Sequence, residues 1–219
     1  MLDRIPNLSL PCAEFAPRNL TASLADPPAR QSATRAAAAM SDAILAKRVQ
    51  KDMRDLKKNP PEFVQAVAVK PTDLRNVYFK LGGLPAPYAG GEYIVQLMLP
   101  AKYPMMPPDI KMLTPSNRFK PDTNICTTFT SYHPDSWTPV YNFNALMISF
   151  VSFMLDDSET THVGAVPAGE RSPARRAELA AASAAFNVKY AKLFAENGTA
   201  LARGGEGAAG AAGAAGVSA

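Results

Sequence analysis

Three rare residue types occur close together in one stretch of the chain. Cys126, His133 and Trp137 lie between Ser116 and Pro139, although the 219 residues contain only two cysteines, two histidines and one tryptophan. The stretch has no helical or strand period before Cys126, and long irregular segments inside compact domains are usually functional. A thiol near an imidazole can help to bind a metal, act as a hydrolase nucleophile or carry an acyl group.

These chemistries make different demands on the sequence. A structural zinc site needs four ligands, which one cysteine and one nearby histidine do not supply. A Cys-His hydrolase needs an imidazole that reaches the thiol, and such enzymes take it from a distant segment. Here His133 is seven residues from Cys126, and His162 is the other histidine. A thioester carrier needs an accessible sulfur and an oxyanion donor, without a strong base beside the sulfur. A buried structural thiol is the simplest alternative.

The elements around this stretch predict one α+β domain over residues 41–196. Ser41 can cap a helix that ends near Lys58, just before two prolines. Four strand-like runs bounded by turn residues then predict a four-stranded antiparallel meander. The runs are 63–71, 75–84, 91–100 and 109–113. After them come the long irregular segment with Cys126 and then two predicted helices, at 142–154 and at about 172–195.

The two ends of the chain differ in composition from this domain. Residues 1–40 are rich in Ala, Pro, Ser and Arg and predict a mobile extension, and the Gly/Ala-rich residues 197–219 should be disordered. A net charge of +4 is too weak to argue for nucleic-acid binding. We find no secretory signal and no apolar run long enough to span a membrane. Two cysteines, one of them Cys12 in the extension, are no disulfide framework, so free thiols in the cytoplasm are expected.

Four motifs occur in the order that ubiquitin-conjugating enzymes share. A Tyr-x-Gly-Gly-x-aromatic turn at 88–93 is followed by YPMMPP at 103–108, by Cys126 and by a Trp-x-Pro step at 137–139. The chain resembles those enzymes over about residues 41–196 and is expected to share their fold. Its TPSNRF, HPDSW and SAAFN segments resemble the J-type, tail-anchored members that act in endoplasmic-reticulum protein degradation.

The resemblance implies a chemistry for the loop. Cys126 would accept the C-terminal carboxyl of ubiquitin as a thioester and pass it to a protein substrate. His133 is the candidate base for the acceptor, which the J-type resemblance extends from lysine to serine and threonine. Asp135 is the second candidate for holding the loop or the acceptor. The family places its oxyanion donor, an asparagine, directly after proline; here the order is Pro-Ser-Asn, so Asn117 or Ser116 would take that role.

The resemblance also implies partners, namely ubiquitin, its activating enzyme, a RING-type ligase and protein substrates. The ligase would contact the basic face of the first helix, the YPMMPP methionines and the step after the tryptophan. These candidates are Lys47, Lys51, Met105, Met106, Thr138, Pro139 and Val140. No metal and no small cofactor are expected, because ATP is used by the activating enzyme. The expected location is the cytoplasm, extending through a partner to the cytosolic face of the endoplasmic reticulum.

Two alternatives from other classes stay open. One is an inactive conjugating-enzyme variant that serves as a ubiquitin-binding or scaffold module, which the displaced Pro-Ser-Asn favours. The other is a Cys-His hydrolase or acyltransferase, which would react with a small activated ester without any activating enzyme.

Overall fold

The computed structural model describes residues 28–156, 158 and 162–201 of the chain. Two compact units divide it at Ala36, and the described part of the first unit, residues 28–36, is helical. The second unit begins at Ala37 and holds the sheet, the remaining helices and the Cys126 loop. Most of the predicted extension, including Cys12, and the tail from residue 202 lie outside the described residues.

The first helix, α1 (Pro28–Lys58), is longer than predicted. The prediction that Ser41 caps its start is wrong, because Ser41 lies inside the helix. Two local features favour the earlier start: proline is common in the first helical turn, and the alanines of 36–39 have the highest helix propensity. Composition alone had placed this alanine-rich stretch in the predicted mobile extension.

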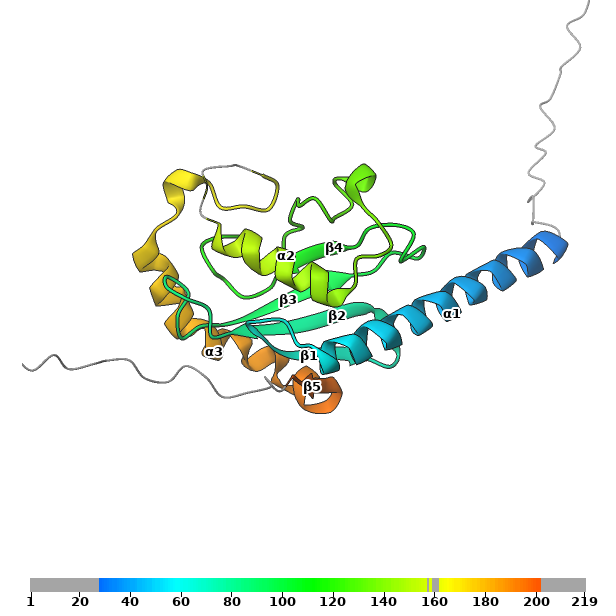
Figure 1. Cartoon of the computed structure of the whole chain (residues 1–219), viewed down its shortest axis with the longest axis horizontal. Coiled ribbons are helices and arrows are strands. Elements are labelled where there is room, and N and C mark those ends of the chain that lie inside the picture. Colours follow the sequence, from blue (N-terminus) through cyan, green and yellow to red (C-terminus); the bar gives the residue numbers. More distant parts are fainter. Residues whose placement is uncertain (1–27, 157, 159–161, 202–219) are drawn as a thin grey trace, which may run out of the picture. The chain divides into compact units, whose positions relative to one another are not determined.

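The four predicted strands form an antiparallel meander (Figure 1). They are β1 (Val64–Lys70), β2 (Asp73–Gly82), β3 (Glu92–Met98) and β4 (Asp109–Met112). Side chains alternate between the two faces of a strand, so one face of the sheet collects the apolar positions. A fully buried row runs across the meander in register: Val67, Phe79, Val95 and Met112.

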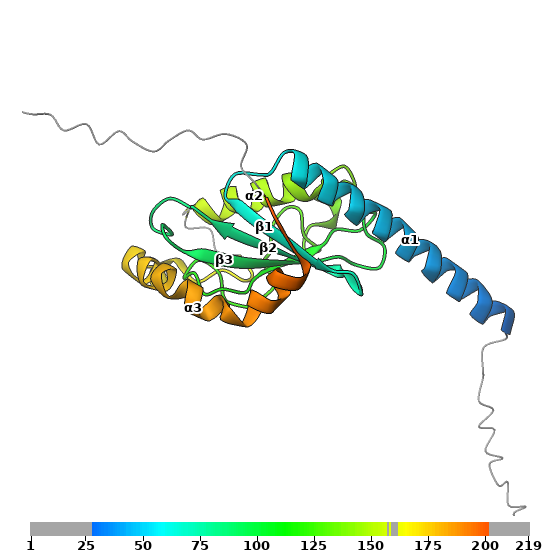
Figure 2. The same cartoon turned by 90° about the horizontal axis from the view of Figure 1, so that it is seen from below.

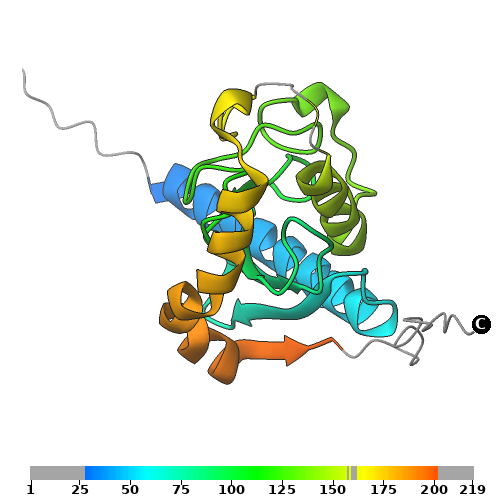
Figure 3. The same ribbon diagram turned by 90° about the vertical axis from the view of Figure 1, so that its left-hand side faces the viewer.

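The sheet carries helices on both faces (Figures 1 and 3). Helix α2 (Phe143–Leu155) lies on the apolar face, where the ring of Phe143 meets Phe79 edge-on at 5.8 Å between centroids. Asn142 caps it by accepting a hydrogen bond from the backbone N–H of Ala145 at 3.0 Å. Helix α3 (Pro173–Asn197) crosses the opposite face, as the view from below shows (Figure 2).

Helix α3 docks through polar side chains rather than through an apolar stripe. Ser183 Oγ accepts a hydrogen bond from Glu92 N at 2.9 Å, and Asn187 Nδ2 donates to Glu92 O at 2.8 Å. Asn187 Oδ1 also accepts from the buried Thr114 hydroxyl at 2.6 Å. The serine and asparagine of the SAAFN segment therefore fasten α3 to β3 and to the segment after β4.

A fifth strand that the sequence analysis did not predict closes the sheet. β5 (Gly198–Ala200) follows α3 directly and pairs with β1, which gives the order β4-β3-β2-β1-β5. The turn from helix to strand requires glycine, since a Cβ on Gly198 would lie 2.1 Å from Phe194 O. Among the described residues, the helices are all too short or too polar to cross a membrane.

Candidate active site

Cys126 lies near the middle of the loop that joins β4 to α2. Ile125 N donates to Ile110 O of β4 at 2.9 Å, so the chain runs beside the sheet up to the cysteine. Cys126 N donates to Val163 O at 3.0 Å, which ties it to the segment that follows α2. That segment passes so close that a Cβ on Gly164, at φ 85°, would lie 2.4 Å from Asn124 O. The Cys126 thiol lies between these two segments and is half-buried.

His133 folds back onto the Cys126 thiol through two successive turns. Thr130 N donates to Thr127 O at 3.1 Å, and His133 N donates to Thr130 O at 2.9 Å. The buried Thr130 hydroxyl closes the first turn, because it accepts from Thr127 N and donates to Thr127 O. As a result, His133 Nε2 lies 3.1 Å from Cys126 Sγ.

This contact supplies more than a thioester carrier was expected to need. A carrier needs no strong base beside the sulfur, and His133 was predicted to act on the acceptor. The sequence analysis also held a separation of seven residues against a Cys-His pair. The structure shows that seven residues are enough, because the two turns bring His133 back beside Cys126.

Burial sets the protonation of the sulfur. It raises the pKa of the Cys126 thiol above its ordinary value of 9.0, because an apolar surrounding disfavours the thiolate. The neutral thiol is therefore the main form near pH 7. A neutral imidazole at 3.1 Å can accept the S–H proton, and an imidazolium can donate to a thiolate. The geometry thus places an acceptor for the thiol proton beside the sulfur.

The two predicted oxyanion donors have other partners. Ser116 is fully buried, and its Oγ accepts a hydrogen bond from Arg118 N at 3.3 Å. Asn117 Nδ2 donates to Glu170 O at 3.3 Å, and its Oδ1 accepts from Ser172 N at 2.8 Å. The amide of Asn117 thereby holds the start of α3. Its role as an oxyanion donor stays a prediction, and it would require the amide to leave these partners.

A second carboxylate near the loop was missed by the sequence analysis. Asp135, the predicted one, lies in a short 3₁₀ helix, η1 (Pro134–Ser136), and is exposed. Asp109, at the start of β4, instead accepts a hydrogen bond from the Ser131 hydroxyl. This bond anchors the middle of the loop to the sheet. The two residues are 22 positions apart, and no local pattern in the sequence connects them.

The second histidine serves a packing role. The ring of His162 packs against Phe153, tilted by 47° with 4.5 Å between centroids, and lies 6.2 Å from Phe119. In the part of the chain that the structure describes, no three His, Cys, Asp or Glu side chains gather as metal ligands would.

Comparison with known proteins decides the family. The family model described as ubiquitin-conjugating enzyme matches residues 48–183, more than half of the chain, with Cys126 and His133 inside the match. The chain belongs to the ubiquitin-conjugating enzyme family. Membership confirms the resemblance and the predicted fold, in which an N-terminal helix, an antiparallel sheet and C-terminal helices follow in that order.

Relatives from plants, fungi and animals share the matched region. "Probable ubiquitin-conjugating enzyme E2 33" of Arabidopsis thaliana is 37% identical over 161 residues, 72% of this chain and 64% of its own. Ubiquitin-conjugating enzyme E2 6 of Schizosaccharomyces pombe is 40% identical, over 52% of this chain and 51% of its own. Human ubiquitin-conjugating enzyme E2 J2 is 34% identical, over 68% of this chain and 57% of its own. This chain thus spans about half to two thirds of these curated relatives. Among solved structures, human E2 G1 gives a TM-score of 0.44 at 26% identity, covering 49% of this chain and 92% of that chain.

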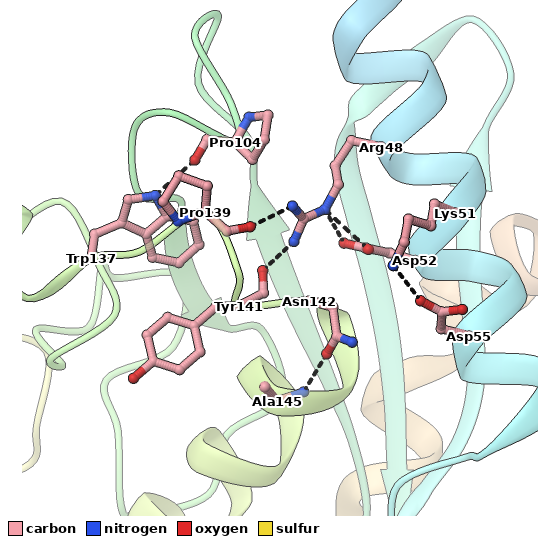
Figure 4. Close-up of polar contacts among 10 residues, drawn as sticks. All are labelled: Arg48, Lys51, Asp52, Asp55, Pro104, Trp137, Pro139, Tyr141, Asn142 and Ala145. Carbon is pink, nitrogen blue, oxygen red and sulfur yellow. Dashed lines mark hydrogen bonds and ion pairs between the residues drawn. The ribbon is translucent and has the colours of Figure 1, made fainter.

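The residues predicted for ligase contact lie on α1 and on two loops. Lys47 and Lys51 are exposed on α1, and Lys51 Nζ pairs with Asp55 at 2.8 Å. The loop residues form an exposed set in which only Pro139 is half-buried: Met105, Met106, Thr138, Pro139 and Val140. Trp137 joins the two loops, because its Nε1–H donates to Pro104 O at 2.8 Å (Figure 4).

Proposed function

We propose that this chain accepts ubiquitin on Cys126 as a thioester and transfers it to a protein substrate. One observation carries the proposal: a half-buried thiol in the family's cysteine loop has an imidazole nitrogen at 3.1 Å. Family membership supports ubiquitin as the group that is carried. An activating enzyme would supply it, having used ATP.

The loading step exchanges one thioester for another. The Cys126 S–H proton passes to His133 Nε2 while the sulfur attacks the thioester carbonyl held by the activating enzyme. The new carbon–sulfur bond forms on Cys126, and the bond to the other cysteine breaks. The leaving thiolate then takes the proton from the imidazolium, which restores neutral His133.

Transfer to the substrate uses the same imidazole. A hydroxyl acceptor needs a base that removes its proton as it attacks, whereas a partly desolvated lysine can supply a free amine. Because His133 is exposed as well as near the sulfur, it can face an incoming acceptor. We therefore include serine and threonine with lysine among the acceptors. A RING-type ligase would dock on the exposed residues of α1 and the two loops.

A charging assay tests the proposal. The protein is incubated with ubiquitin, its activating enzyme and ATP, and adducts are resolved on non-reducing gels. We expect a thiol-sensitive adduct that survives Cys12→Ser and becomes thiol-resistant or disappears in Cys126→Ser. If the folded protein forms no adduct while the activating enzyme charges itself, the proposal fails.

A discharge assay tests the acceptor. The purified thioester is mixed with free lysine or free serine in wild type and in His133→Gln. Loss of a general base costs about 100-fold or more in rate, so discharge onto serine should fall far more than discharge onto lysine. Equal losses on both acceptors would contradict a base role for His133.

Two observations keep other functions in view. The Cys126–His133 contact favours a Cys-His hydrolase or acyltransferase, which would acylate Cys126 from p-nitrophenyl acetate and turn over without an activating enzyme. The engagement of Asn117 with Glu170 and Ser172 favours an inactive, ubiquitin-binding variant. That variant would bind ubiquitin and give no thioester in the charging assay.

A further inference from the structure

A buried ion pair lies on the face of α1 that also carries the buried Leu45, Val49 and Leu56. Arg48 Nε is 2.9 Å and 3.0 Å from the two carboxylate oxygens of Asp52, whose side chain is fully buried. Burial of such a charge is costly unless it is paired. Consistent with this, desolvation raises the pKa of Asp52, and the hydrogen bond and charge of Arg48 oppose the rise.

The same guanidinium also binds the loop that precedes α2. Arg48 Nη1 donates to Pro139 O, and Arg48 Nη2 donates to Tyr141 O (Figure 4). These two carbonyls flank Val140. One side chain therefore binds a buried carboxylate of α1 and both sides of a loop residue more than 90 positions away. Only a planar fork with several donors can make all of these bonds at once.

Aromatic residues connect this loop to the YPMMPP loop. The buried ring of Tyr103 lies 5.6 Å from the Arg48 guanidinium and 6.1 Å from the ring of Trp137. Trp137 in turn donates to Pro104 O. The two loops are thus fixed to each other and to α1.

The fixed loops display exposed apolar side chains. Val140 is 83% exposed, and Met105 and Met106 are 68% and 47% exposed. Such side chains on neighbouring loops are unfavourable in water and mark a surface for a partner. Lys47 and Lys51 add positive charge on the adjoining helix. The surface fits a partner with an apolar centre and an acidic flank.

We infer that Arg48 is a positioning residue that presents Val140 to the ligase. This inference rests on the proposed function, since the partner is the ligase of a conjugating enzyme. The Arg48 side chain is only 14% exposed, so it leaves contact with the ligase to Val140. The hydrogen bonds of Arg48 to the carbonyls on both sides of Val140 keep the loop ordered in the free protein. Ligase binding then carries no entropic cost for ordering that loop.

The first test measures the loop in the free protein. Arg48→Lys keeps a cation opposite Asp52, which protects the fold, but cannot bridge both carbonyls. Arg54→Lys is the matched control, the same substitution at an exposed position of α1. We expect hydrogen exchange in the peptide covering 137–142, where Tyr141 N donates to Thr138 O, to quicken about tenfold in Arg48→Lys only. Unchanged exchange there, or an equal rise across the sheet strands, would overturn the inference.

The second test measures ligase stimulation. A RING domain is chosen because it accelerates lysine discharge from the wild-type thioester, and its half-saturating concentration is measured for Arg48→Lys, Val140→Ala and the double variant. Each single variant should raise the half-saturating concentration about fivefold or more. The double variant should raise it little further than either single variant does. Additive losses would show that Arg48 does not act through Val140. Wild-type charging by the activating enzyme separates failure of this inference from failure of the proposed function.

Discussion

At the scale of single residues, the protonation of Cys126 separates the proposed function from the hydrolase alternative. Burial raises the pKa of this thiol above 9.0, and in the proposed mechanism His133 Nε2, 3.1 Å from the sulfur, accepts its proton. A hydrolase pair would instead hold a thiolate and an imidazolium at neutral pH, because the cation lowers the thiol pKa.

Alkylation by iodoacetamide reports this difference. In a Cys12→Ser background the rate follows the thiolate fraction of Cys126. Because the raised pKa lies above 9.0, the rate should be low at neutral pH and should still climb at about pH 9. A rate that reaches its plateau below pH 8 would show an ion pair and would favour the hydrolase.

At the scale of elements, the site depends on the segment that follows α2. Gly164 adopts φ 85° and passes close to Asn124 O, while the neighbouring Val163 O holds the backbone of Cys126. Gly164→Ala should therefore lower the free energy of unfolding by about 1–3 kcal/mol and slow charging. Urea denaturation and the charging assay measure the two effects. Gly169→Ala is the control, since its added methyl group meets no atom within 4 Å, and equal losses in both variants would refute the argument.

The docking of α3 gives a second prediction about an element. Asn187 accepts from the buried Thr114 hydroxyl and donates to Glu92 O. Asn187→Ala removes both bonds and should destabilise the protein by about 1–3 kcal/mol in urea denaturation. Asn197→Ala, at the end of the same helix with one long bond of 3.5 Å, should change stability by less than about 0.5 kcal/mol. A neutral Asn187→Ala would mean that these bonds do not hold α3 in place.

At the scale of the whole molecule, local patterns predicted the parts of the fold that local rules govern. Strand-like runs bounded by turn residues indicated β1 to β4, and Asn142 and Ser172 marked the starts of α2 and α3. β5 was not predicted because three residues carry no period, and its pairing with β1 joins residues 130 to 134 positions apart. The α1 start escaped because alanine-rich composition suits both a helix and a disordered segment.

The candidate site likewise has parts that the sequence predicts and parts that only the folded chain brings together. Motif order located Cys126, and exposure of Met105 and Val140 agrees with the predicted surface. The partners of Asn117 and the bond between Ser131 and Asp109 arise from chain segments that meet only in the folded protein. Arg48 was not predicted to have a role, since its carbonyl partners follow more than 90 residues later in the sequence.

Intact-protein mass spectrometry of the charging reaction tests the central claim most directly. After one round with the activating enzyme, ATP and ubiquitin, the wild type should gain the mass of one ubiquitin less one water. Dithiothreitol should remove that mass, and Cys126→Ala should never acquire it. An unmodified wild type beside a charged activating enzyme, or an adduct that persists in Cys126→Ala, would contradict the account.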